Sequence, residues 1–318
     1  MTRLRLHPLR NVMPWILVAI ATAPGLARGQ TQYKAMAPEV LVQAWPGATR
    51  PDRTLIEDAL VERRATSLPA LRQSARAGAV AEKLFACALL AEMRDQGSTA
   101  TLLTATTDSD ARVRARAVSA LRIVGDRSAA SRMRQLVRGE KSGPVLKVSL
   151  AALGELGTSR DAGLVRPLLS HPSEDVRVMA AGALAMLGDQ GGQEIVLAAT
   201  RSADPWVQKQ ATFALGYLGT PEATARVHEI LDDPSGQWKS YAVMALALQE
   251  LRAQSPQEQV VTLDRVARGQ DRLAADWALD RLVDLASPEA TQELATLTGQ
   301  PGELGRQAAR RLKAIAGR

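Results

Sequence analysis

Apolar residues recur along this chain with a period of about 31 residues, a spacing typical of tandem structural repeats. The marker is an Ala-Leu pair that occurs seven times, at successive spacings of 32, 32, 31, 31, 31 and 33 residues. In the central units, a valine precedes the alanine by seven residues and another apolar residue follows it by four. At 100° per residue these positions share one side of a helix, so each unit is predicted to contain an amphipathic helix. The seven alanines are Ala88, Ala120, Ala152, Ala183, Ala214, Ala245 and Ala278.

Each of these helices is expected to end at a glycine and to be followed by a second helix. Gly125, Gly157, Gly188 and Gly219 follow the apolar stripe, where glycine adopts a left-handed conformation without a Cβ clash. The next residues are suitable helix caps, and 220–222 reads Thr-Pro-Glu, a cap, an N1 proline and a first-turn acid. Each unit is therefore predicted to be a helical hairpin. Neither helix can bury its apolar face alone, so successive hairpins must stack.

These units resemble the HEAT-repeat family, in particular the short variety associated with phycobilin lyases. The family pattern of an Asp-Val-Arg step, alanines and a Leu-Gly end is matched by 175–189 and 214–220. The resemblance covers residues 79–318 and implies an all-α fold, an α-solenoid of about seven to eight antiparallel helical hairpins in a HEAT-like superhelix. It also implies that second helices line the concave surface. We expect an elongated rod whose chain ends lie far apart.

The first 29 residues are predicted to be a secretory signal peptide. They carry four arginines and no acid, an apolar stretch over 12–23, and a small-x-small cleavage sequence at 27–29. The alternative is a membrane anchor, but about a dozen apolar residues interrupted by Pro14 fall short of the roughly 20 needed to span a bilayer. We expect a periplasmic or secreted protein with no transmembrane segment in the mature chain.

The remaining boundaries follow from composition. Residues 30–51 contain three prolines and are predicted to form an extended lead-in. Residues 52–78 are predicted to form a degenerate N-terminal capping hairpin, and residues 79–318 the repeat domain. The last unit presents several bases, which are expected to form a polar outer face where stacking ends. They are Arg306, Arg310, Arg311 and Lys313.

The residues that usually carry catalysis are scarce. The chain has one cysteine and three histidines, and it lacks the common nucleophile-elbow, phosphate-loop, dinucleotide and zinc-protease motifs. Among HEAT-like folds, deoxyhypusine hydroxylase binds iron with several His-Glu pairs, whereas this chain has one, at 228–229. We therefore predict a non-catalytic protein with no cofactor and no metal. The alternative is a lyase- or hydrolase-like enzyme that depends on His228 or Cys87.

Charge is distributed unevenly along the repeats. The formal charge is +7, and removal of the first 29 residues leaves 36 bases against 33 acids. Residues 111–147 hold ten bases and two acids, whereas 148–300 hold 12 bases and 20 acids. Arg132, Arg134 and Arg138 are the candidates for binding an acidic protein face, or an anionic glycan or lipid. The alternative is that the run solvates a face and pairs with acids of adjacent repeats. Nucleic acid is not an expected partner.

Half of the ten aromatic residues lie between positions 206 and 241. Trp206, Phe213 and Tyr217 share a helical stripe away from the apolar one and form either a recognition surface or a packing contact between first helices. Taken together, the fold and the scarcity of reactive groups predict an exported scaffold that mediates protein–protein interactions in the cell envelope.

Overall fold

The structure is a computed structural model that describes residues 32–315, so the predicted signal peptide lies outside the described residues. Every regular element within 32–315 is an α-helix or a 3₁₀-helix, and none is a strand. The prediction of an all-α solenoid is confirmed. Within this range, no helix is long and apolar enough to cross a membrane.

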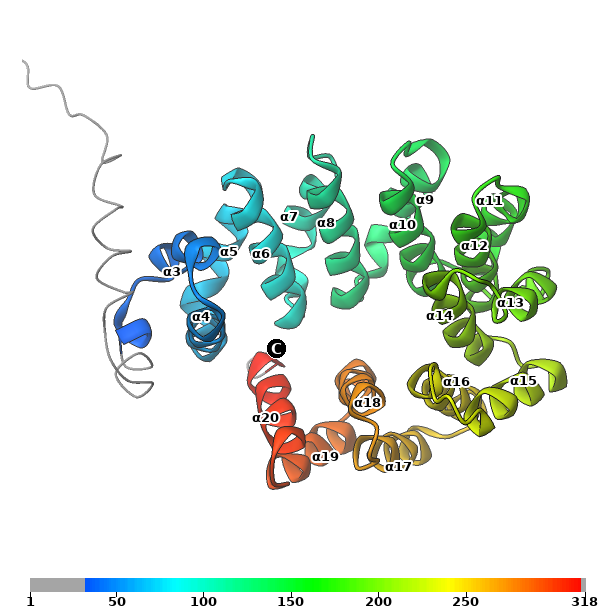
Figure 1. The fold of residues 1–318 in the computed structure, drawn as a ribbon. Helices are drawn as coiled ribbons and strands as arrows, with labels where there is room; N and C mark the ends of the chain where they lie inside the picture. The colour runs from blue at the N-terminus through cyan, green and yellow to red at the C-terminus, as the bar shows by residue number, and fades with distance from the viewer. Residues whose placement is uncertain (1–31, 316–318) are drawn as a thin grey trace, which may run out of the picture.

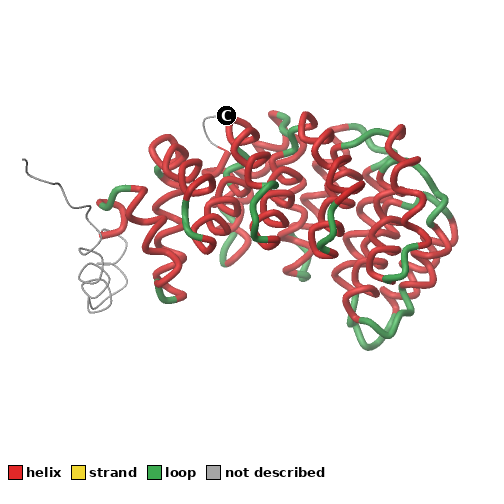
Figure 2. The backbone as a smooth tube through the Cα atoms, turned by 90° about the horizontal axis from the view of Figure 1, so that it is seen from above, coloured by secondary structure: helices red, strands yellow, loops and turns green. Residues whose placement is uncertain are grey.

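The repeats are helical hairpins stacked side by side, as Figure 2 shows along the long axis of the molecule. Hairpins run from α4–α5 to α18–α19, and a single helix, α20, follows them. The elements are α4 (Arg50–Glu62), α5 (Arg64–Ala77), α6 (Val80–Glu92), α7 (Thr99–Ala105), α8 (Ala111–Val124), α9 (Ala130–Gly139), α10 (Gly143–Leu156), η4 (Ser159–Asp161), α11 (Ala162–Val165), η5 (Arg166–Ser170), α12 (Glu174–Met186), α13 (Gln193–Ala199), α14 (Pro205–Ala214), η6 (Leu215–Tyr217), α15 (Pro221–Asp232), α16 (Lys239–Leu251), α17 (Pro256–Ala267), α18 (Arg272–Leu285), α19 (Pro288–Thr298) and α20 (Glu303–Ile315).

Side chains cap the helices where the sequence predicts a start. The Asp110 carboxylate accepts a hydrogen bond from the Arg112 amide at 2.8 Å, and Asp204 accepts one from Trp206 at 2.7 Å. Thr220 caps α15 in the same way. Each cap satisfies a backbone N–H that the first helical turn leaves free.

The predicted left-handed glycines are confirmed at two of the four positions. Gly125 and Gly188 have φ of 77° and 84°. Gly157 and Gly219 have no positive φ, so the prediction is wrong there. The backbone of Gly157 is extended, and glycine is favoured for a different reason: a Cβ would lie 2.4 Å from the Leu153 carbonyl oxygen. Gly219 follows the tighter 3₁₀ turn η6 rather than an α-helical end.

The predicted extended lead-in is wrong, because its prolines start helices. Residues 30–51 include α3 (Pro38–Ala44), the 3₁₀-helix η1 (Trp45–Gly47) and the start of α4. Pro38 and Pro51 occupy the first turns of their helices, where a missing N–H and a fixed φ cost nothing. Helices α4 and α5 form the hairpin predicted for 52–78.

The solenoid closes on itself, so the predicted elongated rod with separated ends is wrong. In Figure 1 the chain curves until α20 returns to α4 and α6, and we call this closed course of helices the ring. Helices α12, α14, α16 and α18 lie inside the curve, with α13, α15 and α17 outside. First helices therefore line the concave side, contrary to the implication of the resemblance.

Small residues on the inner helices explain the curvature. A Cβ on Gly154 would lie 3.1 Å from the Ala183 Cα, and one on Gly216 would lie 2.8 Å from the Ala245 Cα. Such close approach shortens the inner layer relative to the outer one. A small difference repeated at each step bends the whole stack.

We expect Gly216→Ala to destabilise the protein by about 1–3 kcal/mol, because the new Cβ overlaps backbone atoms that cannot rotate away. Gly163→Ala is the control: it lies in α11 with nothing within 4 Å of a built Cβ. Urea unfolding monitored by circular dichroism measures both variants. Equal stability of the two would contradict close packing of the inner layer.

Candidate functional site

The first feature of the inner side is the contact that closes the ring. Arg310 of α20 donates to Asp58 at 3.0 Å, to Glu57 at 3.1 Å and to Glu92 at 3.1 Å. Burial by itself would lower the pKa of Arg310. Its hydrogen bond to Glu92 and the surrounding negative charges have the larger effect, so the net shift is upward and the guanidinium stays charged. One base thus binds three acids from α4 and α6.

The end of α20 is also held by apolar and backbone contacts. Ala314 is buried in the core cluster of the N-terminal repeats. Arg64 donates to the carbonyl oxygens of Ala314 and Met93, both at 2.6 Å, and Lys313 pairs with Glu62 at 3.1 Å. The contacts of Ala314 and Lys313 join residues about 250 positions apart in the chain.

The predicted polar outer face of the last unit is therefore wrong for most of its bases. Arg310 and Lys313 pair with the first hairpin and its neighbour, and Arg311 donates to Asp280 of α18 at 2.9 Å. Arg306 remains 70% exposed and pairs locally with Glu303. The acids of the first repeats supply the partners that an open end would lack.

A second set of polar contacts crosses the inside of the ring. Arg94, which follows α6 after its C-cap, pairs with Asp284 of α18. Arg281 donates to Asp284 at 3.4 Å and to the Tyr217 hydroxyl of η6 at 3.3 Å. These four residues, the inner network, join opposite walls of the ring.

The inner network is partly buried, with side-chain exposures of 10% for Arg94, 26% for Arg281 and 35% for Asp284. Burial raises the pKa of Asp284 in spite of the attraction of Arg94 and Arg281. Burial likewise raises the pKa of Tyr217. For Arg281, burial by itself would lower the pKa, but the negative groups around it have the larger effect, so the pKa is raised. Arg281 is thus held in its charged form among partly dehydrated neighbours.

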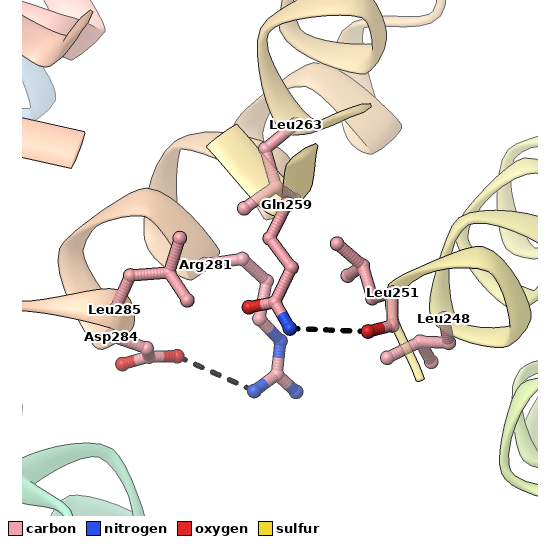
Figure 3. Close-up of a pocket in the computed structure, with 7 residues that line it drawn as sticks. All are labelled: Leu248, Leu251, Gln259, Leu263, Arg281, Asp284 and Leu285. Carbon is pink, nitrogen blue, oxygen red and sulfur yellow. Dashed lines mark hydrogen bonds and ion pairs between the residues drawn. The ribbon is translucent and has the colours of Figure 1, made fainter. Parts of the chain in front are cut away.

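A cavity of about 200 Å³ adjoins the inner network, between α16, α17 and α18 (Figure 3). Gln259 donates to the carbonyl oxygens of Leu251 at 3.1 Å and Gln254 at 3.2 Å. Its Oε1 accepts no hydrogen bond from the described residues. The lining residues are Leu248, Leu251, Gln259, Leu263, Arg281, Asp284 and Leu285.

The arginines singled out from the sequence lie on α9, a second helix and therefore in the outer layer. Arg132 donates to the hydroxyl and carbonyl oxygens of Thr106 at 2.8 and 3.1 Å. Arg134 pairs with Asp161 at 2.6 Å and holds the pKa of that carboxyl below its usual range. Arg138 is exposed and makes no ion pair within 32–315. Two of the three are thus occupied by neighbouring repeats.

Of the three aromatic candidates, Phe213 and Tyr217 lie together, and Trp206 lies in a different environment. The Lys147 ammonium lies 4.2 Å from the centre of the Trp206 ring. Phe213 packs against the core of the C-terminal repeats and contacts the Tyr217 ring edge-on at 5.7 Å. Tyr217 belongs to the inner network. Phe213 and Tyr217 therefore lie on the concave side, and Trp206 lies at the start of α14.

Sequence reasoning missed Arg94, Arg281 and Asp284, and it assigned Arg310 to a polar outer face. One signal for Arg281 exists in the repeat alignment: it lies three residues after Ala278, as Tyr217 lies three residues after Ala214. The other units place alanine, isoleucine, methionine or leucine at this point, except for Glu155. A polar group at a position that is elsewhere apolar marks the inner face.

The reactive groups named from the sequence are held apart. Burial raises the pKa of the Cys87 thiol to about 12. The His171 Nδ1 accepts a hydrogen bond from the Ser173 amide at 3.1 Å, and His228 is exposed on α15. Across 32–315, no three histidine, cysteine or acidic side chains are grouped so as to hold a metal ion.

Comparison with known proteins identifies a family model described as HEAT repeats, which matches residues 68–154 and 162–247, more than half of the chain. No curated protein matches the sequence. The complex of CpcE and CpcF of phycocyanin lyase from Nostoc sp. PCC7120 is 18% identical, with a TM-score of 0.55 over 83% of this chain and 98% of that one. The Escherichia coli protein YibA is 16% identical, with a TM-score of 0.46 over 82% and 97%. Human deoxyhypusine hydroxylase is 15% identical, with a TM-score of 0.35 over 81% and 97%. At these identities the likeness concerns the fold alone.

Proposed function

Because the chain belongs to the HEAT-repeat family, we propose that it is an exported, non-catalytic scaffold that binds a protein partner in the cell envelope. HEAT repeats suggest a protein-interaction scaffold. Stacked hairpins form an extended surface on which several weak contacts add up.

The observation that carries this proposal is a set of four exposed bases on or beside the second helices α9 and α11. Arg127, Arg138, Lys141 and Arg160 are exposed, and none makes an ion pair with another residue of 32–315. We call these four residues the outer basic surface. Some neighbouring bases are neutralised, as in the Arg114–Glu140 pair at 3.0 Å, whereas Arg116 is also exposed and makes no ion pair within 32–315. Unneutralised positive charge favours an acidic partner and speeds its association.

The environment of the candidate nucleophile and acid–base groups supports a non-catalytic role. Cys87 is fully buried with a raised pKa, so it carries no thiolate at neutral pH. His228 lies on the outer helix α15, away from the cavity. Partner binding is therefore expected to survive both Cys87→Ser and His228→Ala.

Export predicts a mature chain that begins near Gln30, because residues 1–29 have the features of a cleaved signal peptide. Intact-mass measurement of the protein recovered from the periplasm tests this. Recovery of the uncleaved chain from the cytoplasm in the native host would contradict it. Ala27→Asp should block cleavage and leave the precursor at the membrane.

The triple variant Arg127→Glu, Arg138→Glu, Lys141→Glu should reduce capture of the partner from the native envelope by about tenfold or more, because it reverses the outer basic surface. Capture by the unmodified chain should weaken as salt is added. The matched control reverses three bases elsewhere, Arg265, Arg272 and Arg306, and gives the same net charge.

Equal loss in both triple variants would contradict a local binding surface. Retention on anionic glycan or lipid vesicles is measured in parallel. Protein capture that persists in the first variant while this retention disappears would identify an anionic polymer or lipid as the ligand in place of an acidic protein.

A further inference from the structure

The guanidinium of Arg281 has unused hydrogen-bonding capacity on the concave side of the ring, where its side chain is 26% exposed. It carries five N–H donors, of which two donate, to Asp284 at 3.4 Å and to Tyr217 at 3.3 Å. Both distances are long for N–H···O bonds. The remaining donors have no partner among residues 32–315. Figure 3 shows this guanidinium at the wall of the cavity.

The charges beside the cavity form a continuous set of ion pairs. Arg122 pairs with Glu155 at 2.7 Å, and Arg311 pairs with Asp280 at 2.9 Å and with Asp276 at 3.6 Å. Asp284 lies between two bases, Arg94 and Arg281, and Arg94 also lies 4.0 Å from Asp280. Because Asp284 would repel further negative charge, the site favours a ligand with one negative group over a ligand with two.

Most of the cavity wall is hydrocarbon. Leu248, Leu251, Leu263 and Leu285 contribute it from α16, α17 and α18. The volume of about 200 Å³ is below the usual range for drug-sized ligands. The wall therefore suits a short aliphatic group whose polar end reaches Arg281.

We propose that this cavity binds a small aliphatic monocarboxylate, with the carboxylate on the free N–H groups of Arg281 and the hydrocarbon between the leucines. The same chemistry is offered by a free short-chain acid and by the C-terminal carboxylate of a peptide that ends in leucine. This site lies inside the ring, apart from the outer basic surface, so it goes beyond the scaffold function and does not depend on it.

Isothermal titration of the mature chain tests the proposal with octanoate for the free acid and N-acetyl-leucine for the peptide end. Each is paired with a matched compound, octanol and N-acetyl-leucinamide, that lacks the negative charge. We expect at least one of the carboxylates to bind about tenfold or more tightly than its neutral counterpart. Octylammonium should not bind. Whichever carboxylate binds identifies the source.

Two variants and a control locate the binding. Arg281→Gln should lower affinity about tenfold or more by removing the charge. Leu285→Phe should also lower the affinity, because the larger side chain fills the cavity while Arg281 is unchanged. This variant tests the proposal if Arg281→Gln fails to fold. Arg265→Gln, on α17 with a side chain 62% exposed, should bind as the unmodified chain does. Binding unchanged in Leu285→Phe, equal binding of the neutral compounds, or no binding of either carboxylate would overturn the proposal.

Discussion

Arg310→Glu should open the ring. The change removes one base from three acids and places a fourth carboxylate among Glu57, Asp58 and Glu92. Burial already raises the pKa of Asp58, so an added negative charge there is poorly solvated. We expect the free energy of unfolding to fall by roughly 3 kcal/mol or more. Small-angle X-ray scattering should show a larger radius of gyration and a longer maximum dimension.

The control is Arg306→Glu, the same charge change on the same helix. Arg306 is 70% exposed and contacts Glu303 within its own helix, so its reversal should leave the shape unchanged. An Arg310→Glu chain as compact as the Arg306→Glu chain would contradict closure by ion pairs. It would mean that burial of Ala314 against the N-terminal core suffices to hold α20.

The hairpins were predictable because their signals are local. An alanine stripe, a glycine and a capping residue lie within about ten residues of each other, and each acts through neighbouring backbone groups. The closure was not predictable in the same way. Arg310 and Glu57 carry ordinary charges that are 253 positions apart, and they meet because close contacts such as that at Gly216 bend every step slightly.

In the candidate site, too, local features were predictable from the sequence and long-range contacts were not. The sequence indicated an excess of bases over 111–147, but the partners of those bases belong to other repeats, as Asp161 does for Arg134. Which bases remain free depends on this pairing. The inner network depends on curvature, because Arg94 and Asp284 are 190 positions apart. Their charges alone gave no reason to associate them.

Acid should weaken the packing of the early repeats, because ion pairs there tie each first helix to the turn after its hairpin, or one hairpin to the next. In each pair a hydrogen bond from the base holds the carboxyl pKa below its usual range. The unfolded chain, with ordinary carboxyl pKa values, binds protons first as the pH falls. The stability from these pairs is therefore present above the ordinary value of about 4 and is lost as the pH falls through the lower folded values. The pairs are Lys83–Asp108 at 2.7 Å, Arg114–Glu140 at 3.0 Å and Arg134–Asp161 at 2.6 Å.

At about 0.5–1 kcal/mol for each of the three pairs, the free energy of unfolding should drop by roughly 1.5–3 kcal/mol between pH 6 and pH 3. Asp58 and Asp284 have the opposite effect on stability. Burial raises their pKa values, so protonation as the pH falls relieves the cost of burying their negative charges. Urea unfolding across this range measures the net slope. Asp161→Asn should flatten the slope, whereas Glu289→Gln, an exposed acid of α19 with no ion pair in 32–315, should not. Identical slopes for both variants would show that acid acts on other groups. The stacking of the hairpins would then depend on their apolar core, in which Val113, Val145 and Val176 are buried.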